Sequence, residues 1–163
     1  MSRAAGILLS ISSLPGEYGI GCFSKSAYDF VDWLKEAGQT YWQILPLGPT
    51  SYGDSPYQSF STFAGNPYYI SLEALIKEGV LTKEECDAAD LGNKPNDISY
   101  HKLYNHRYPL PRMAYERSQI SKNPDFIKFV NENNWWLSDY ALFMAAKDRF
   151  EGKPWTDWAE DIR

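Results

Sequence analysis

Two apolar segments of strand length enclose an amphipathic helix near the start of the sequence, and this pattern limits the chain to few folds. Residues 4–11 and 40–47 are the predicted strands, and residues 24–38 are the predicted helix. Ser24 can cap the helix and Gly38 can end it, and one helix face carries Ala27, Phe30, Val31, Leu34 and Ala37. The sequence therefore predicts a βαβ unit whose crossover sets the strands parallel in one sheet, with residues 4–11 buried.

A loop rich in rings, residues 48–69, follows the second predicted strand. It holds six aromatic rings, no Val, Ile, Leu or Met, and one charged side chain, Asp54. It would leave the carboxyl end of a parallel strand, which is the edge where α/β sheets and barrels bind ligands. Tyr and Trp rings suit both protein cores and sugars. Asp54 is either a catalytic carboxylate or an acid that shapes its turn.

Beyond the loop, the alternation of strand and helix stops. Residues 71–80 and 82–90 are predicted as short helices, and Thr82 and Glu85 have the spacing of a capping box. Further along, a four-residue spacing sets three rings on one helix side, where they form either a packing ridge or a ligand platform: Tyr100, Tyr104 and Tyr108.

A long helix is predicted near the end of the sequence, with Asn123 as its N-cap and Pro124 at its first position. Residues 135–150 are apolar on nearly all sides, so this helix needs neighbours on all sides. One βαβ unit hardly supplies them, and a parallel pair of strands alone would leave both edges unpaired. We therefore expect the chain to be the N-terminal part of a larger α/β protein.

Charge and composition exclude several classes of function. The chain has 16 basic and 21 acidic side chains and no stripe of Lys or Arg, so neither nucleic acid nor an anionic membrane is expected as a partner. The first apolar run is too short to span a membrane, which predicts a cytoplasmic protein. Cys22 and Cys86 are predicted to be free thiols, and the spacing of His101 and His106 predicts no metal site.

Three long motifs resemble the N-terminal third of a 4-alpha-glucanotransferase, the amylomaltase or disproportionating enzyme of glycoside hydrolase family 77. They are "SSLPGEYGIG", "YWQILPLGPTSYGDSPYQSFSTFAGNPYYI" and "WWLSDYALFMAAK". The resemblance implies a (β/α)8 barrel that transfers segments of α-1,4-glucans by a retaining double displacement, without a cofactor. A barrel needs about 250 residues, so this chain holds only its start. The family's catalytic Asp, Glu and second Asp belong to motifs that these residues lack.

The resemblance also implies roles for residues of the loop. Tyr57 matches the ring that stacks on the sugar next to the nucleophile, and Ser55 is a polar contact beside it. Asp54 matches a shaper of the loop. Tyr52 and Tyr104 match aromatics that hold a glucan at a secondary groove in some members. No catalytic residue and no metal ligand is expected among these residues.

The expected organisation follows from the same resemblance. Residues 1–71 are the first βαβ unit with the substrate-binding loop, residues 72–122 an inserted helical subdomain, and residues 123–163 helices that return to the barrel. The expected partners are maltooligosaccharides or other α-1,4-glucans and the remainder of the barrel. Two alternatives are a non-catalytic glucan-binding module and an interaction protein whose rings are all core. Alone, the chain is expected to be inactive.

Overall fold

The computed structural model describes residues 3–50, 53–92, 94 and 96–162. The chain forms two compact units, Met1–Ser118 and Gln119–Arg163. Among the described helices, none is both long and apolar enough to cross a membrane.

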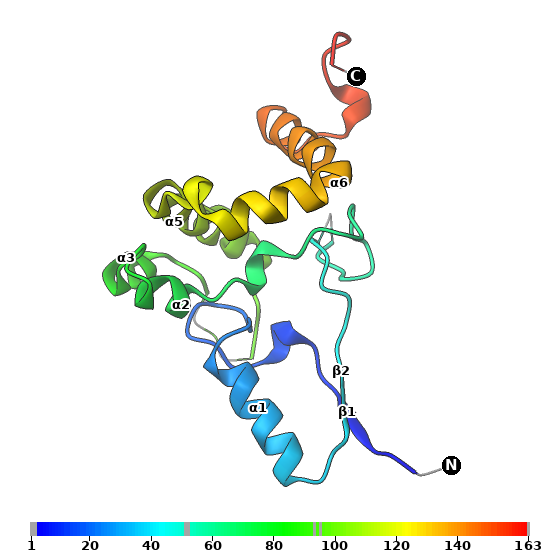
Figure 1. The fold of residues 1–163 in the computed structure, drawn as a ribbon, viewed down its shortest axis with the longest axis vertical. Coiled ribbons are helices and arrows are strands. Elements are labelled where there is room, and N and C mark those ends of the chain that lie inside the picture. The colour runs from blue at the N-terminus through cyan, green and yellow to red at the C-terminus, as the bar shows by residue number, and fades with distance from the viewer. Residues whose placement is uncertain (1–2, 51–52, 93, 95, 163) are drawn as a thin grey trace. The chain divides into compact units, whose positions relative to one another are not determined.

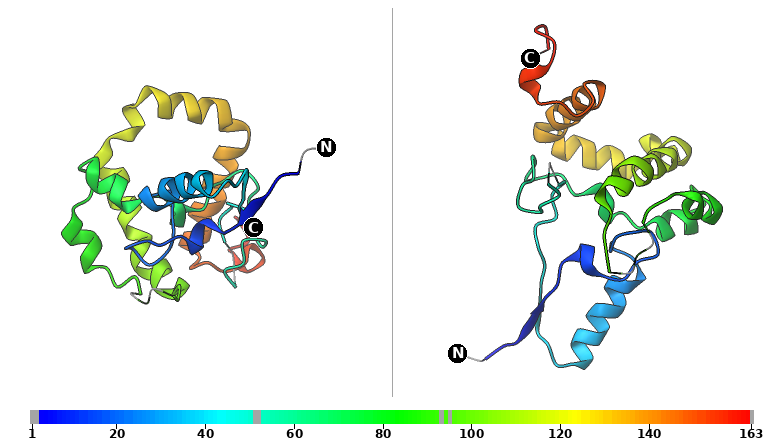
Figure 2. Two further views of the ribbon diagram at one scale, coloured as in Figure 1. Left: turned by 90° about the horizontal axis from the view of Figure 1, so that it is seen from below. Right: turned by 180° about the vertical axis from the view of Figure 1, so that it is seen from behind.

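The first unit begins with the predicted βαβ arrangement. Strand β1 (Gly6–Leu8) pairs in parallel with β2 (Tyr41–Gln43), with Gly6 opposite Tyr41 and Leu8 opposite Gln43. Helix α1 (Lys25–Glu36) returns the chain between them, antiparallel to both strands (Figures 1 and 2). The predicted βαβ unit and the parallel direction of its strands are therefore confirmed.

Helix α1 contacts the strands through aromatic rings. The ring of Phe30 meets the ring of Trp42 edge to face, with centroids 4.9 Å apart, and the indole nitrogen of Trp42 donates to the carbonyl of Leu9 at 2.8 Å.

Gly38 ends the helix with φ of 70°, a left-handed conformation that glycine adopts without steric cost. Ser24 occupies the N-cap position, as predicted, but its hydroxyl makes no capping bond to the helix backbone.

The strands are shorter and more exposed than predicted. Each has three residues, no further strand within the described ranges pairs with either, and the side chain of Leu8 is 58% exposed. The prediction of a buried strand at residues 4–11 is thus wrong for the chain as it stands. Parallel strands are normally covered on both faces, and here α1 is the helix that packs on them.

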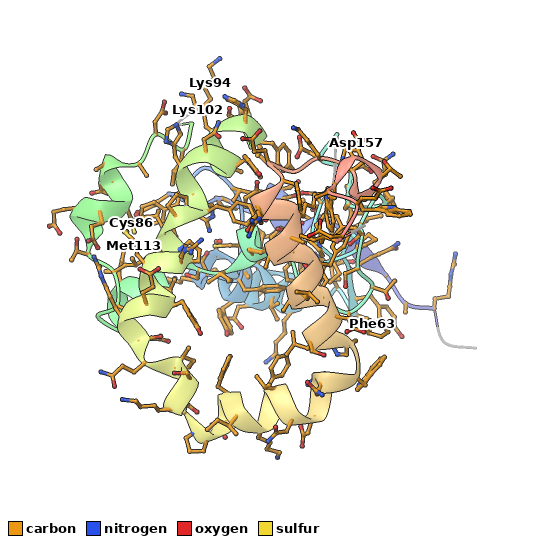
Figure 3. All side chains as sticks on the ribbon, turned by 90° about the horizontal axis from the view of Figure 1, so that it is seen from above. Phe63, Cys86, Lys94, Lys102, Met113 and Asp157 are labelled. Atoms are coloured by element: carbon orange, nitrogen blue, oxygen red, sulfur yellow. The ribbon has the colours of Figure 1, made fainter. Side chains whose placement is uncertain are left out.

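The core of the first unit includes Ala27 of α1, with Trp42 of β2 packed against it, but most of it lies between loops and short helices. These elements are η1 (Ile11–Ser13), η2 (Pro67–Tyr69), α2 (Leu72–Lys77), α3 (Lys83–Ala88), α4 (Tyr100–Lys102), the π-helical η3 (Leu103–Arg107) and α5 (Pro109–Ser118). The buried cluster includes Cys86 of α3, and Met113 of α5 packs against it (Figure 3). Cys22 and Cys86 are both buried free thiols, as predicted.

One carboxylate, that of Glu85, caps helix α3 and also pairs with a residue of α5. The hydroxyl of Thr82 accepts from the amide of Glu85 at 3.2 Å, and the carboxylate of Glu85 accepts from the amide of Thr82 at 2.9 Å, so the predicted capping box is confirmed. The same carboxylate accepts two hydrogen bonds from the guanidinium of Arg117, at 2.7 and 2.8 Å. Glu85 therefore joins the start of α3 to α5.

A π-helical turn leads into α5. Its wide hydrogen bond joins the amide of Tyr108 to the carbonyl of Leu103, 3.4 Å apart. Pro109 and Pro111, which follow, have no amide hydrogen and cannot donate to the carbonyls four residues earlier. Wide turns of this kind are frequent at functional sites.

The second unit contains η4 (Ile120–Lys122), the long helix α6 (Pro124–Arg149) and η5 (Trp155–Asp157). Asn123 caps α6, since its side-chain oxygen accepts from the amide of Asp125 at 2.8 Å, which confirms the predicted cap. Trp158 packs against the rings of Phe143 and Phe150, each at 5.4 Å. No side chain of α6 is buried, in keeping with a helix that needs further neighbours.

The shared carboxylate of Glu85 predicts a pH dependence of stability. The hydrogen bonds from Arg117 and from the amide of Thr82 lower the pKa of Glu85 from 4.5 to about 2. Because the folded pKa is the lower one, the stabilisation is complete above pH 4.5 and is lost as the pH falls toward 2. Glu85→Gln should thus destabilise the protein at pH 7, and the difference from the parent should shrink in acid.

Urea denaturation of the parent and of Glu85→Gln between pH 7 and pH 3 measures this difference. Glu84→Gln is the matched control, because the Glu84 carboxylate, on the same helix, makes no ion pair within the described residues. A difference between parent and Glu85→Gln that stays constant over this range would contradict the assignment.

Candidate functional site

The loop after β2 is closed at its base. The amide of Asn66 donates to the carbonyl of Leu47 at 2.8 Å, which joins the two ends of the intervening segment. The buried side chain of Asn66 accepts from the amide of Tyr68 at 3.0 Å and so starts η2. We call the described residues of 48–65, which lie between these two bonded ends, the ring loop, and Leu47 with residues 66–70 its stem.

Serine side chains set the path of the ring loop. The hydroxyl of Ser59 donates to the carbonyl of Ser61 at 2.7 Å, and the hydroxyl of Ser61 accepts from the amide of Ala64 at 3.0 Å. Gly48 lies against this turn, where a Cβ atom would collide with the Ser59 side chain. The short polar side chains thus replace the backbone ladder that a loop lacks.

Tyr57 is the most exposed of the described aromatic side chains, at 73%. It is the third residue of a tight turn in which the carbonyl of Ser55 accepts from the amide of Gln58 at 3.1 Å. The hydroxyl of Ser55 accepts from the amide of Tyr57 at 3.3 Å. The turn holds the backbone of Tyr57 while its ring stays open to solvent, which is the arrangement a stacking platform requires.

Asp54 lies in the turn before Ser55, in a left-handed conformation with φ of 57°, and Gly53 before it has φ of 91°. Desolvation raises the pKa of the half-buried Asp54 carboxyl above its ordinary value. Asp tolerates this backbone conformation better than most residues. The geometry is that of a turn-forming acid, and its assigned part in substrate binding stays a prediction.

Two of the three tyrosines of residues 100–108 contact the stem of the loop. The buried ring of Tyr68 lies 6.2 Å from that of Tyr100 and 5.2 Å from that of Tyr108. Burial raises the pKa of Tyr68, and the charges of Tyr108 and Asp54 add to this effect. Two rings of the predicted ridge therefore pack against the stem.

Tyr104 differs from the other two rings of the ridge. It contacts Tyr108 at 5.7 Å but is 60% exposed, so its outer face is open to a ligand. Tyr52, its predicted companion at a secondary groove, lies outside the described residues.

The sequence interpretation missed Arg107, whose side chain is 1% exposed. Its guanidinium donates to the carbonyls of Tyr18, Tyr68 and Ile70, the last two at the stem of the ring loop. One signal was present in the sequence, because Arg107 falls on the apolar stripe formed by Leu103, Leu110 and Ala114. The positions of that stripe indicate burial whatever the residue type.

A hollow of about 620 Å³ lies elsewhere. Its lining comes from residues 12–17 and 19–21 and from Gly92, Lys94 and residues 96–98, and none of these residues is aromatic. It offers no stacking surface for a sugar, so the ring loop remains the better candidate. No cluster of three or more His, Cys, Asp or Glu side chains suited to a metal ion occurs in the described part of the chain.

This chain resembles several known 4-alpha-glucanotransferases. The family model described as 4-alpha-glucanotransferase, glycoside hydrolase family 77, matches residues 9–163. The 4-alpha-glucanotransferase of Streptococcus pneumoniae is 48% identical over 159 residues, and that of Thermus thermophilus is 46% identical over 167 residues. These alignments cover 97% and 100% of this chain and 32% of each relative.

A solved structure agrees with these relatives. The amylomaltase from Streptococcus agalactiae, in complex with acarbose, superposes with a TM-score of 0.89 at 40% identity, over 98% of this chain and 32% of that one. The chain thus spans about a third of the length of the proteins it matches. Because the family model covers nearly the whole chain, the protein belongs to the 4-alpha-glucanotransferases of glycoside hydrolase family 77.

Proposed function

We propose that this chain is the N-terminal part of a cytoplasmic 4-alpha-glucanotransferase, which transfers a segment of an α-1,4-glucan to a glucose or glucan acceptor. The observation that carries the proposal is the exposed ring of Tyr57, held on a closed loop that leaves the carboxyl end of the parallel strand β2. In parallel α/β folds that end of the sheet is where ligands bind. Membership of the family supports the reaction type.

The chemistry of the loop suits a glucan. A glucose unit presents apolar CH faces and a rim of hydroxyl groups, and an exposed tyrosine offers a flat apolar face with one polar end. The Tyr57 ring would stack on a sugar face, while Ser55 and Asp54 lie two and three residues before this exposed ring. Tyr104, with Tyr52, would hold a glucan at a secondary groove away from the active centre.

The architecture that fits this function is a (β/α)8 barrel. The βαβ unit of residues 1–71 would be its first unit, residues 72–122 an inserted helical subdomain, and residues 123–163 helices that return to the barrel wall. The remainder of the barrel would cover the exposed strands and the exposed faces of α6. Retaining transfer needs two carboxyl groups about 5–5.5 Å apart, and the loop holds one acid, Asp54. The catalytic pair would therefore come from the remainder, as the family resemblance implies.

A non-catalytic glucan-binding module is the second candidate. The presence of one acid, Asp54, in the loop favours this candidate, because catalysis needs two carboxyl groups, whereas the exposed ring of Tyr57 could bind a glucan without catalysis. Titration of residues 1–163 with maltoheptaose, followed by tryptophan fluorescence, tests for such autonomous binding. No fluorescence change, together with turnover by the full-length protein, would reject this candidate.

Turnover of maltotriose tests the proposed transferase activity. The full-length protein that contains this chain should convert maltotriose into glucose and longer glucans, and a polypeptide of residues 1–163 should not. Chromatography of the products checks both, and acarbose, with which the amylomaltase of Streptococcus agalactiae was solved, is a suitable competing probe. An inactive full-length protein would contradict the proposed function.

Substitution of Tyr57 tests its role as the ring on which the sugar stacks. Tyr57→Ala in the full-length protein should lower kcat/KM for maltotriose by about 2- to 12-fold, which corresponds to about 0.5–1.5 kcal/mol of lost ring stacking. Tyr57→Phe should keep most of the activity, because the ring remains. Tyr28→Ala is the matched control, since Tyr28 is 72% exposed but lies on α1. Equal losses for Tyr57→Ala and Tyr28→Ala would remove Tyr57 from the binding site.

A further inference from the structure

Arg107 is a buried cation that carbonyl oxygens stabilise. Its Nη1 donates to the carbonyl of Tyr18 at 3.1 Å, and its Nη2 donates to the carbonyls of Tyr68 at 3.1 Å and Ile70 at 2.8 Å. No carboxylate of the described residues forms an ion pair with it, and its Nε has no hydrogen-bond partner there. Burial lowers the pKa of Arg107, and the three carbonyl dipoles, with the nearby Cys22 thiol and Glu73 carboxylate, stabilise its charged form.

The three acceptors come from segments that are distant in sequence. Tyr18 lies in the first loop, 89 residues before Arg107, while Tyr68 and Ile70 end the stem of the ring loop, 39 and 37 residues before it. A guanidinium is a rigid planar fork, so it fixes the separation of these carbonyls. A lysine ammonium is a point charge and cannot fix three acceptors in this way.

The stem that Arg107 holds also sets the base of the ring loop. Between Leu47 and Tyr68, the base is closed through Asn66, which bonds to the backbone of both. The ring of Tyr68 packs against Tyr100 and Tyr108, on either side of Arg107 in the sequence. A shift of the Tyr68 carbonyl would therefore move the base from which the loop presents its exposed ring.

We propose that Arg107 is a positioning residue for glucan binding, which holds the stem of the ring loop so that Tyr57 meets the sugar in the correct place. The inference rests on the proposed function and assigns Arg107 no contact with substrate. Loss of the fork should weaken binding of the glucan more than it slows the chemical step, because the carboxylates that act on the bond lie elsewhere. The effect should also depend on the presence of the Tyr57 ring.

The test uses the full-length protein with Arg107→Lys and Arg107→Met, each with Tyr57 intact and in a Tyr57→Ala background. Residues that act through one another show non-additive effects. With Tyr57 present, either Arg107 substitution should therefore raise KM for maltotriose about fivefold or more. In the Tyr57→Ala background, the same substitution should raise KM less than about twofold. The value of kcat should change less than KM. Arg117→Lys is the matched control, because Arg117 lies in the same helical segment and pairs with Glu85 at the surface.

Several outcomes would overturn the positioning role. They are equal rises of KM in both backgrounds, a fall in kcat with KM unchanged, and the same response to Arg117→Lys. Circular dichroism and thermal melting report on folding. If neither Arg107 variant folds, the residue serves the fold itself and the positioning role is rejected.

The proposed function can fail separately. If the parent shows no turnover, the dissociation constant for maltoheptaose replaces KM in the same comparison. If the parent binds maltoheptaose but shows no turnover, the proposed transferase activity is contradicted, and the dissociation constants then decide the role of Arg107. If the parent neither binds maltoheptaose nor shows turnover, the proposed function and the role of Arg107 are both contradicted.

Discussion

The hydrogen bonds of one buried guanidinium organise the first unit. Arg107 gathers the carbonyls of Tyr18, Tyr68 and Ile70, so the first loop, the stem of the ring loop and the helical segment share one core. Hydrogen bonds to charged groups contribute about 1.5–3 kcal/mol each, and leaving such a group without partners costs more. These bonds stabilise the observed arrangement of the three segments, in which the apolar cluster is also buried.

The distribution of burial in the chain is uneven for a physical reason. The loops and short helices around Arg107 are well covered, whereas the parallel strands and the faces of α6 are exposed. Parallel strands need cover on both faces, and the chain spans about a third of the relatives that it matches. In the proposed barrel, the exposed surfaces are those that the remaining strands and helices would cover.

Local signals in the sequence predicted local structure well. The spacing of apolar residues located α1, Thr82 and Glu85 predicted the capping box, and Asn123 predicted the start of α6. The strand lengths were overestimated, because the extent of a strand depends on partners and cover that a local pattern does not report.

The candidate site was predicted in part. Position after a parallel strand identified the loop, and the resemblance singled out Tyr57, which the structure leaves exposed. The support of the loop was not predictable, since a contact such as that of Arg107 with Tyr18 joins residues 89 positions apart. Short-range patterns do not encode which distant carbonyls a buried cation will meet.

The bond between Asn66 and Leu47 has a thermodynamic consequence for ligand binding. It joins the two ends of the ring loop, so part of the entropic cost of closing that segment is met on folding. In the proposed function, a glucan that stacks on Tyr57 would meet a loop whose base is already fixed. Preorganisation of this kind raises affinity by lowering the entropic cost of association, without any additional contact to the ligand.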